Sequence, residues 1–300
     1  MKLKLFVDPR DYQICFLILF LLLGIFNRDW HLSCSHFISL ILSCLLTQFI
    51  AENIANIREI FSFFSLKICH YNQDFNWKIT GLKSALTTSL GLSLLIRSNG
   101  VFPLVVAGVT AIASKFIFSV GKKHFFNPGN FGIISALALT HNAWVSPGQW
   151  GHEWFYLALF ICTGALVLNK VGRWETTGAF LITYILLSCM YNCYLGWEWD
   201  VVWHQLGTGS LLVFAFFMIS DPRSIPDSKI GRTIWSILVA TLAFVLGSLF
   251  YVYNAIFISL FVLSPLTVLL DKIWEGQRFY WPIPQVQSEH KLSVANGGQA

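Results

Sequence analysis

The sequence predicts an all-α integral membrane protein with about ten transmembrane helices, and three observations carry that prediction. Of the 300 residues, 55% are hydrophobic and only 12% are charged, whereas a soluble domain carries about 25% charged residues. Apolar stretches of roughly bilayer-spanning length recur along the chain. The basic residues gather in alternate connecting segments. The cations are dispersed rather than gathered on one face, so we expect a lipid bilayer, and no nucleic acid, as partner.

Ten apolar stretches are candidate spans, because a helix needs roughly 17 to 25 residues to cross the hydrocarbon core. They run approximately over Tyr12–Phe26, Leu32–Ala51, Ile79–Ile96, Val101–Val120, Phe131–Val145, Trp154–Asn169, Thr176–Leu195, Val201–Ile219, Arg232–Gly247 and Asn254–Leu270. The first, fifth and sixth are short, which favours tilted or re-entrant segments there. The polar stretch Glu52–Trp77 is long enough for an interfacial helix.

The basic residues test this count independently. With a cytoplasmic N-terminus and ten alternating spans, 17 of the 20 Lys and Arg residues fall inside, two (Arg28 and Arg97) fall outside, and Lys83 lies within a span. This asymmetry agrees with the positive-inside rule. It predicts one polytopic domain over residues 1–272, both termini in the cytoplasm, and a disordered cytoplasmic tail over residues 273–300.

Ten spans divide into two sets of five, and an odd number in each half gives the halves opposite orientations. Parity therefore suggests a 5+5 inverted repeat. The two halves share no convincing sequence identity, so nothing else in the sequence supports the repeat.

Two segments on the predicted inner face combine turn residues with polar side chains. In the first, Asn127 is a candidate N-cap and Pro128 fits the first turn of the following helix, which also contains Asn130. In the second, Asp221 before Pro222 ends one helix and places a carboxylate near the membrane surface. Two interpretations stay open for each segment: a rigid capped loop, or a helix-end site for an anionic group or cofactor.

Other polar residues point to no defined chemistry. The seven cysteines include no CxxC pair, so no metal site is predicted. Four histidines are candidates for proton relay or heme ligation, although their places at span ends favour interfacial roles; they are His124, His141, His152 and His204. Lys83, about one turn from the membrane boundary, is expected to extend its amine to the inside face. Catalytic residues stay unassigned, because no nucleotide-binding or hydrolase motif occurs.

The polar segments, taken in order, resemble one family. The resemblance rests on these segments: Gly-Lys-Lys before Phe126-Asn127-Pro128, the string Ala-Phe-Phe-Met-x-x-Asp-Pro ending at Pro222, Gly231-Arg232, and Ser264-Pro265-Leu266 with Asp271. This pattern, roughly from Gly81 to Asp271, is similar to the RnfD/NqrB family. Its members are membrane subunits of the Rnf-type electron transport complex and of the sodium-pumping NADH:quinone oxidoreductase.

The resemblance implies a fold of ten helices related to urea transporters and a flavin cofactor. It also implies a bacterial plasma (inner) membrane location, with electron transport coupled to movement of Na⁺ or H⁺ and other membrane electron-transport subunits as partners. It makes the following residues candidates for cofactor binding: Asn127, Pro128, Asn130, Thr208, Asp221 and Pro222.

One departure from the family pattern concerns flavin attachment. Family members with covalent FMN share a Ser/Thr-Gly-Ala-Thr-type motif, and the Thr of this motif is bonded to FMN through the phosphate. In the matching interval, Thr140–Gly151, the only hydroxyls belong to Thr140 and Ser146, and no Gly-Ala-Thr occurs. The resemblance therefore predicts no covalent flavin, so FMN or riboflavin would bind noncovalently. The alternative function is a non-redox transporter or channel for a small solute on the same ten-helix fold.

Overall fold

The computed structural model describes residues 8–27, 30, 33–54, 81–121, 123–146 and 154–281. The helices are α1 (Pro9–Asn27), α2 (Cys34–Glu52), α4 (Leu82–Leu95), α5 (Val101–Ile117), α6 (Pro128–Leu139), α7 (Trp154–Val171), α8 (Trp174–Leu195), α9 (Trp199–Leu206), α10 (Gly209–Val213), α11 (Lys229–Phe244), α12 (Ala255–Leu263) and α13 (Leu266–Ile273). Two π-helices continue α10 and α11, namely η1 (Phe214–Met218) and η2 (Val245–Leu249). The short strands are β1 (Ile96–Ser98), β2 (Ser119–Val120), β3 (Lys123–His124) and β4 (Ala143–Val145).

Each predicted span coincides with a helix or a pair of consecutive helices. By length and composition, α1, α2, α8 and the continuous α11–η2 can cross a membrane, and the number rises to six if two bent pairs each count as one span. The bent pairs are α9 with α10–η1, at 51°, and α12 with α13, at 48°. In the described part of the chain α5, α6 and most of α7 are apolar but shorter. A multi-pass, all-α membrane protein is thus confirmed.

The predicted fifth span, Phe131–Val145, is wrong at its C-terminal end. Helix α6 stops at Leu139, and the next residue, Thr140, adopts an extended backbone. Residues of β4 then pair antiparallel with β1, so that Val145 lies opposite Ile96. The predicted interfacial helix over Glu52–Trp77 falls almost wholly on residues 55–80, which lie outside the described residues.

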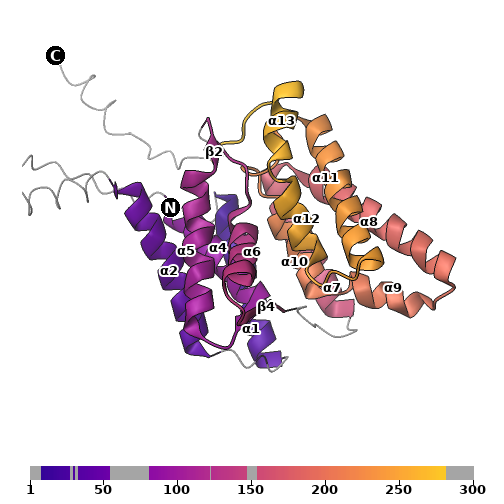
Figure 1. Cartoon of the computed structure of the whole chain (residues 1–300), viewed down its shortest axis with the longest axis horizontal. Coiled ribbons are helices and arrows are strands. Elements are labelled where there is room, and N and C mark those ends of the chain that lie inside the picture. Colours follow the sequence, from indigo (N-terminus) through magenta and orange to yellow (C-terminus); the bar gives the residue numbers. More distant parts are fainter. Residues whose placement is uncertain are drawn as a thin grey trace, which may run out of the picture.

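The helices form two groups that lie side by side in Figure 1. In the first group α2 packs on α4 and α5, α5 on α6, and α1 on α4. In the second, α11 packs on α8, α12 and α13, while η1 contacts α7 and α8. Contacts of α1 with α7 and of α6 with α12 join the groups. The first group contains the predicted spans one to five, and the second contains spans six to ten.

Helix α2 shows which environment surrounds the bundle. Its outward face carries the large apolar side chains Ile38, Leu42, Leu46 and Ile50, each at least half exposed. Its buried face contains polar groups, among them His36, Ser43 and Gln48. This is the reverse of a soluble amphipathic helix. An apolar face without a protein partner is stable in hydrocarbon, so lipid is the medium that fits α2.

The segment after α13 runs back across the end of the bundle. Arg278 donates from Nη1 to the carbonyl oxygen of Gly121 at 2.6 Å, and Arg173 donates to the carbonyl oxygen of Gln277 at 3.3 Å. The guanidinium of Arg10 lies 4.8 Å from the centre of a Trp281 ring. Residues 274–281, placed by the sequence in a disordered tail, therefore contact the membrane domain. Residues 282–300 lie outside the described part, so the domain boundary stays a prediction.

Packing of α5 against α6 depends on Gly132. A Cβ atom at this position would lie 2.5 Å from the carbonyl oxygen of Ala107 and 2.8 Å from Cβ of Ala111. We therefore expect Gly132→Ala to lower the free energy of unfolding by about 1 to 3 kcal/mol, measured as a lower thermal midpoint in detergent. Gly178→Ala is the matched control, since its Cβ would come no closer than 3.9 Å to Trp174. Equal midpoints for the two variants would disprove the close contact.

Candidate functional site

The π-helix η1 is tied to three other helices through its carbonyl groups. A π-turn is wider than an α-turn, and the N–H of Ile219 accordingly bonds back to the carbonyl of Phe214 at 2.9 Å. Three carbonyls of η1 accept hydrogen bonds from side chains elsewhere: from Thr177 on α8 at 2.6 Å, from Gln13 on α1 at 3.4 Å, and from Asn127 before α6 at 3.0 Å. The Ala-Phe-Phe-Met segment thus sits where α1, α6 and α8 converge.

Asn127 connects this junction to the start of α6. Its Oδ1 accepts a hydrogen bond from the N–H of Asn130 at 3.0 Å, and Pro128 occupies the first turn. The N-cap predicted from the sequence is confirmed. Its Nδ2 donates in the other direction, to the carbonyl of Met218. Both ends of the amide are used, so Asn127 fixes the N-terminus of α6 beside the C-terminus of η1.

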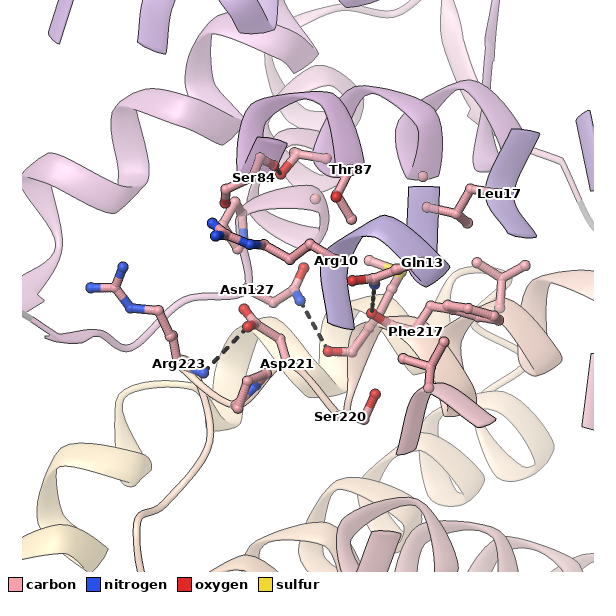
Figure 2. A pocket seen from close by; sticks show the side chains of 18 of the residues that line it. Arg10, Gln13, Leu17, Ser84, Thr87, Asn127, Phe217, Ser220, Asp221 and Arg223 are labelled. Carbon is pink, nitrogen blue, oxygen red and sulfur yellow. Dashed lines mark hydrogen bonds between the residues drawn. The ribbon is translucent and has the colours of Figure 1, made fainter. Parts of the chain in front are cut away.

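A cavity of about 90 Å³ lies at this junction. Figure 2 shows side chains that line it, among them residues of α1, α4, η1 and the loop after η1. Its polar lining includes Arg10, Gln13, Ser84, His124, Asn127 and Asp221, and its apolar lining includes Leu17, Leu92, Ile133, Val213 and Phe217. A mainly apolar wall with a few convergent polar groups is typical of a small-molecule site.

His124 and Asp221 form a pair on the polar side of the cavity. Nε2 of His124 lies 3.5 Å from Oδ2 of Asp221, and Oδ1 of Asp221 accepts from the backbone N–H of Arg223 at 3.3 Å. Burial lowers the pKa of His124, and the nearby carboxylate only partly opposes that effect. Burial alone would raise the pKa of Asp221, but the His124 ring and the Arg223 N–H bring it below its usual range. At neutral pH the pair is a neutral imidazole beside a carboxylate.

Two basic side chains and a helix N-terminus also line the cavity. Arg10 is held by Asp8, with Nη2 2.6 Å from Oδ2. The guanidinium of Arg223 extends away from the Asp221 carboxylate that its backbone binds (Figure 2). The N-terminus of α6, at Pro128, adds its partial positive charge. These groups favour an anionic or electron-rich ligand.

A buried ion-pair cluster supports the loops beside the cavity. Nζ of Lys123 lies 2.6 Å from Asp271 and 3.0 Å from Asp227. Arg232, which is fully buried, pairs with Glu175 and donates to the carbonyl of Asp227 at 2.7 Å. The cluster therefore links β3 to α8, α11 and α13. The sequence singled out Arg232 and Asp271 through the family resemblance, without a role for either.

The structure brings together four of the six predicted site residues. Asn127, Pro128, Asp221 and Pro222 all line the cavity. Asn130 instead donates from Nδ2 to the carbonyl of Phe257 on α12 at 3.0 Å. Thr208 lies at the break between α9 and α10, and its hydroxyl donates to the carbonyl of Gln205. Asp221 follows the opposite end of the continuous α10–η1 helix.

Sequence reasoning missed several cavity residues. Arg10 and Gln13 come from α1, outside the resemblance, and no local pattern announces them. Ser84 accepts a hydrogen bond from Lys115 at 3.1 Å. His124, considered from the sequence for proton relay or heme ligation, instead lies beside Asp221 in the cavity wall. Lys83, expected to extend to the inside face, pairs with Asp11 at 2.6 Å. Among the described residues, no three His, Cys, Asp or Glu side chains are placed to hold a metal ion.

An apolar helical bundle of this kind defines a polytopic membrane protein. The chain belongs to the NQR2, RnfD, RnfE family, whose pattern matches residues 105–279. That range contains Asn127, Asp221 and the whole of η1, so the family match covers most of the junction that forms the cavity.

Three relatives illustrate the similarity. The proteins from Vibrio atlanticus, Aeromonas hydrophila and Cellvibrio japonicus are each named as the D subunit of an ion-translocating oxidoreductase complex. They are 29%, 25% and 25% identical to this chain over 113, 115 and 122 residues. Those segments make up 38%, 38% and 39% of this chain. They cover only about a third of the relatives, at 32%, 33% and 34% of their lengths.

The lowered pKa of His124 predicts a pH-dependent stability. The unfolded chain takes up a proton near the usual value of about 6.5, whereas the folded chain does so only at lower pH, so acidification favours unfolding. We expect stability to fall from about pH 7.5 to about pH 5.5, and His124→Gln to reduce that fall. One unit of depression corresponds to about 1.4 kcal/mol.

The measurement is the thermal midpoint of both proteins across this pH range. His141→Gln, which replaces an exposed histidine, is the control. Identical slopes for His124→Gln and the wild type would show that His124 titrates as it does in the unfolded chain.

Proposed function

We propose that the chain is a membrane subunit of an ion-coupled electron-transport complex in a bacterial inner membrane. The observation that carries the proposal is the convergence of Asn127 and Asp221, the two turn motifs of the family pattern, on one cavity. The names of the relatives support a role beside other membrane subunits of an oxidoreductase. The exposed apolar face of α2 supports residence in the bilayer.

The chemistry of the cavity lining fits a noncovalent flavin. An isoalloxazine ring has apolar faces and one edge of alternating hydrogen-bond donors and acceptors, and the cavity offers apolar walls with a convergent polar side. Nε2 of the buried His124 lies 3.5 Å from Asp221 Oδ2 and makes no shorter hydrogen bond within the described residues. The enclosed volume of about 90 Å³ is small for such a ligand. A bound flavin would therefore also use the open side, beside Arg10 and Trp281.

A bound flavin would supply a group that accepts and passes on electrons. On this proposal Asp221, as a carboxylate, accepts a hydrogen bond from the ligand. Arg10 and the N-terminus of α6 stabilise negative charge on it. Leu17, Leu92 and Phe217 exclude water from its apolar faces. His124, neutral at physiological pH, is available either to donate or to accept a proton at Nε2.

The interval that would hold a covalent flavin supports noncovalent binding. The hydroxyl of Thr140 is buried and donates to the carbonyl of Ala136 at 2.6 Å. The hydroxyl therefore satisfies a carbonyl in the last turn of α6, and it is not directed at a ligand. The backbone N–H of Ser146 bonds to the carbonyl of Leu95 at 2.7 Å, as part of the β1–β4 ribbon. Residues 147–151 of this interval lie outside the described residues.

The flavin proposal is tested by filling the cavity from Gly91. This residue lines the cavity, and a Cβ atom placed on it would meet nothing within 4 Å. We expect purified wild-type chain to quench the fluorescence of added riboflavin or FMN, and Gly91→Leu to weaken that binding about tenfold or more. Gly178→Leu, on the outer surface of α8, is the matched control and leaves binding unchanged.

Two outcomes would count against the proposal. Absence of saturable flavin binding to the wild type would favour the non-redox transporter. A fluorescent band at the mass of the chain on a denaturing gel would show covalent attachment and overturn the noncovalent assignment.

We further propose ten crossings in a 5+5 arrangement with both termini in the cytoplasm. The 17 to two distribution of basic residues and the two groups of helices support this topology. Reporter fusions after Leu195 and after Lys272 are then expected to face opposite sides, with Leu195 outside. Reports from the same side would be incompatible with ten alternating spans.

A further inference from the structure

A second cavity, of about 180 Å³, lies at the C-terminal end of α8, between α8, α9 and η2. It plays no part in the proposed function. Its lining is formed by Ser188, Tyr191, Asn192, Trp197, Val201, Val202, Gln205, Phe244, Gly247, Ser248 and Tyr251. The volume is large enough for a small organic molecule and larger than a single water needs.

Two buried side-chain oxygens of this lining have no hydrogen-bond partner among the described residues. Ser188 is 4% exposed and Asn192 is 3% exposed. Oγ of Ser188 and Oδ1 of Asn192 have no partner within the described residues. The orientation of the Asn192 amide is determined, because its Nδ2 donates to the carbonyl of Trp197 at 3.1 Å. Oδ1 is therefore an unused acceptor, and a buried acceptor of this kind is costly without a donor.

The electrostatic environment of the cavity favours a cation. No Lys or Arg occurs between Trp174 and Pro222 or between Thr233 and Asp271, the two stretches that supply the lining. Glu198 lies with Trp197 and Val201 on an open hollow beside the cavity. Four aromatic side chains of the lining, those of Tyr191, Trp197, Phe244 and Tyr251, offer electron-rich faces.

We propose that this cavity binds a small ammonium ion, either NH₄⁺ or a short primary alkylammonium. An –NH₃⁺ group brings three donors and no acceptor, which matches the free Asn192 Oδ1 and the Ser188 hydroxyl. Aromatic faces stabilise the charge. A short alkyl chain fits the apolar side formed by Val201, Val202 and Phe244. An anion would find no basic side chain on the two stretches that supply this lining.

The test measures binding of radiolabelled methylammonium to the full chain in detergent by equilibrium dialysis. We expect saturable binding that propylammonium displaces more effectively than Na⁺ or tetramethylammonium, because tetramethylammonium has charge but no N–H donor. Ser188→Ala and Asn192→Leu are expected to weaken binding about tenfold or more. Thr176→Val is the matched control, since it removes another buried, unpartnered hydroxyl of α8 that lies away from the cavity.

Several results would overturn the proposal. One is no saturable binding by the wild type, and another is equal displacement by tetramethylammonium and propylammonium. A third is unchanged affinity of Ser188→Ala for methylammonium. This variant loses a single oxygen atom, and its thermal midpoint shows whether it folds like the wild type. The flavin measurement uses the other cavity, so failure here leaves the electron-transport proposal unaffected.

Discussion

The structure depends on a constraint that the bilayer imposes on backbone carbonyls. A carbonyl in an apolar interior must find a donor, and the wide turn of η1 leaves several outside the regular helical pattern. Thr177, Gln13 and Asn127 supply donors from three different elements. Each bond also fixes the position of the helix that donates it. The backbone irregularity therefore orients α8, α1 and α6 around one point.

The same bonds determine the chemistry of the cavity. Because Asn127 binds η1 through Nδ2 and caps α6 through Oδ1, the partial positive charge of that helix end lies beside Asp221. The Asp221 carboxylate is 19% exposed, so it is only partly shielded from a ligand or from solvent. A neutral His124 next to it gives the site one proton acceptor and one anion, whose protonation changes at different pH values. The lining can therefore stabilise charge on a bound group without carrying a large charge of its own.

Much of this architecture follows from local sequence, and the rest depends on distant contacts. Apolar stretches located the long helices of the described residues, and turn chemistry identified Asn127 and Asp221, because both signals lie within a few consecutive residues. The C-terminus of the predicted fifth span was wrong because β4 forms by pairing with β1, almost fifty residues earlier. Arg10 and Gln13 reach the cavity only because α1 packs on α4 and α7. No periodicity within α1 encodes that placement.

The charge pattern that predicts orientation also separates the two cavities by ligand type. The positive-inside rule concentrates basic residues on one side of a membrane, and two of them, Arg10 and Arg223, line the His124–Asp221 cavity. The cavity beside Ser188 and Asn192 lies on stretches without any Lys or Arg. In the topology proposed above, the bundle would have an anion-favouring end and a cation-favouring end. The two proposed ligands follow this difference: a flavin would gain negative charge on reduction beside Arg10 and the N-terminus of α6, and an ammonium ion would lie where the surrounding stretches carry no Lys or Arg.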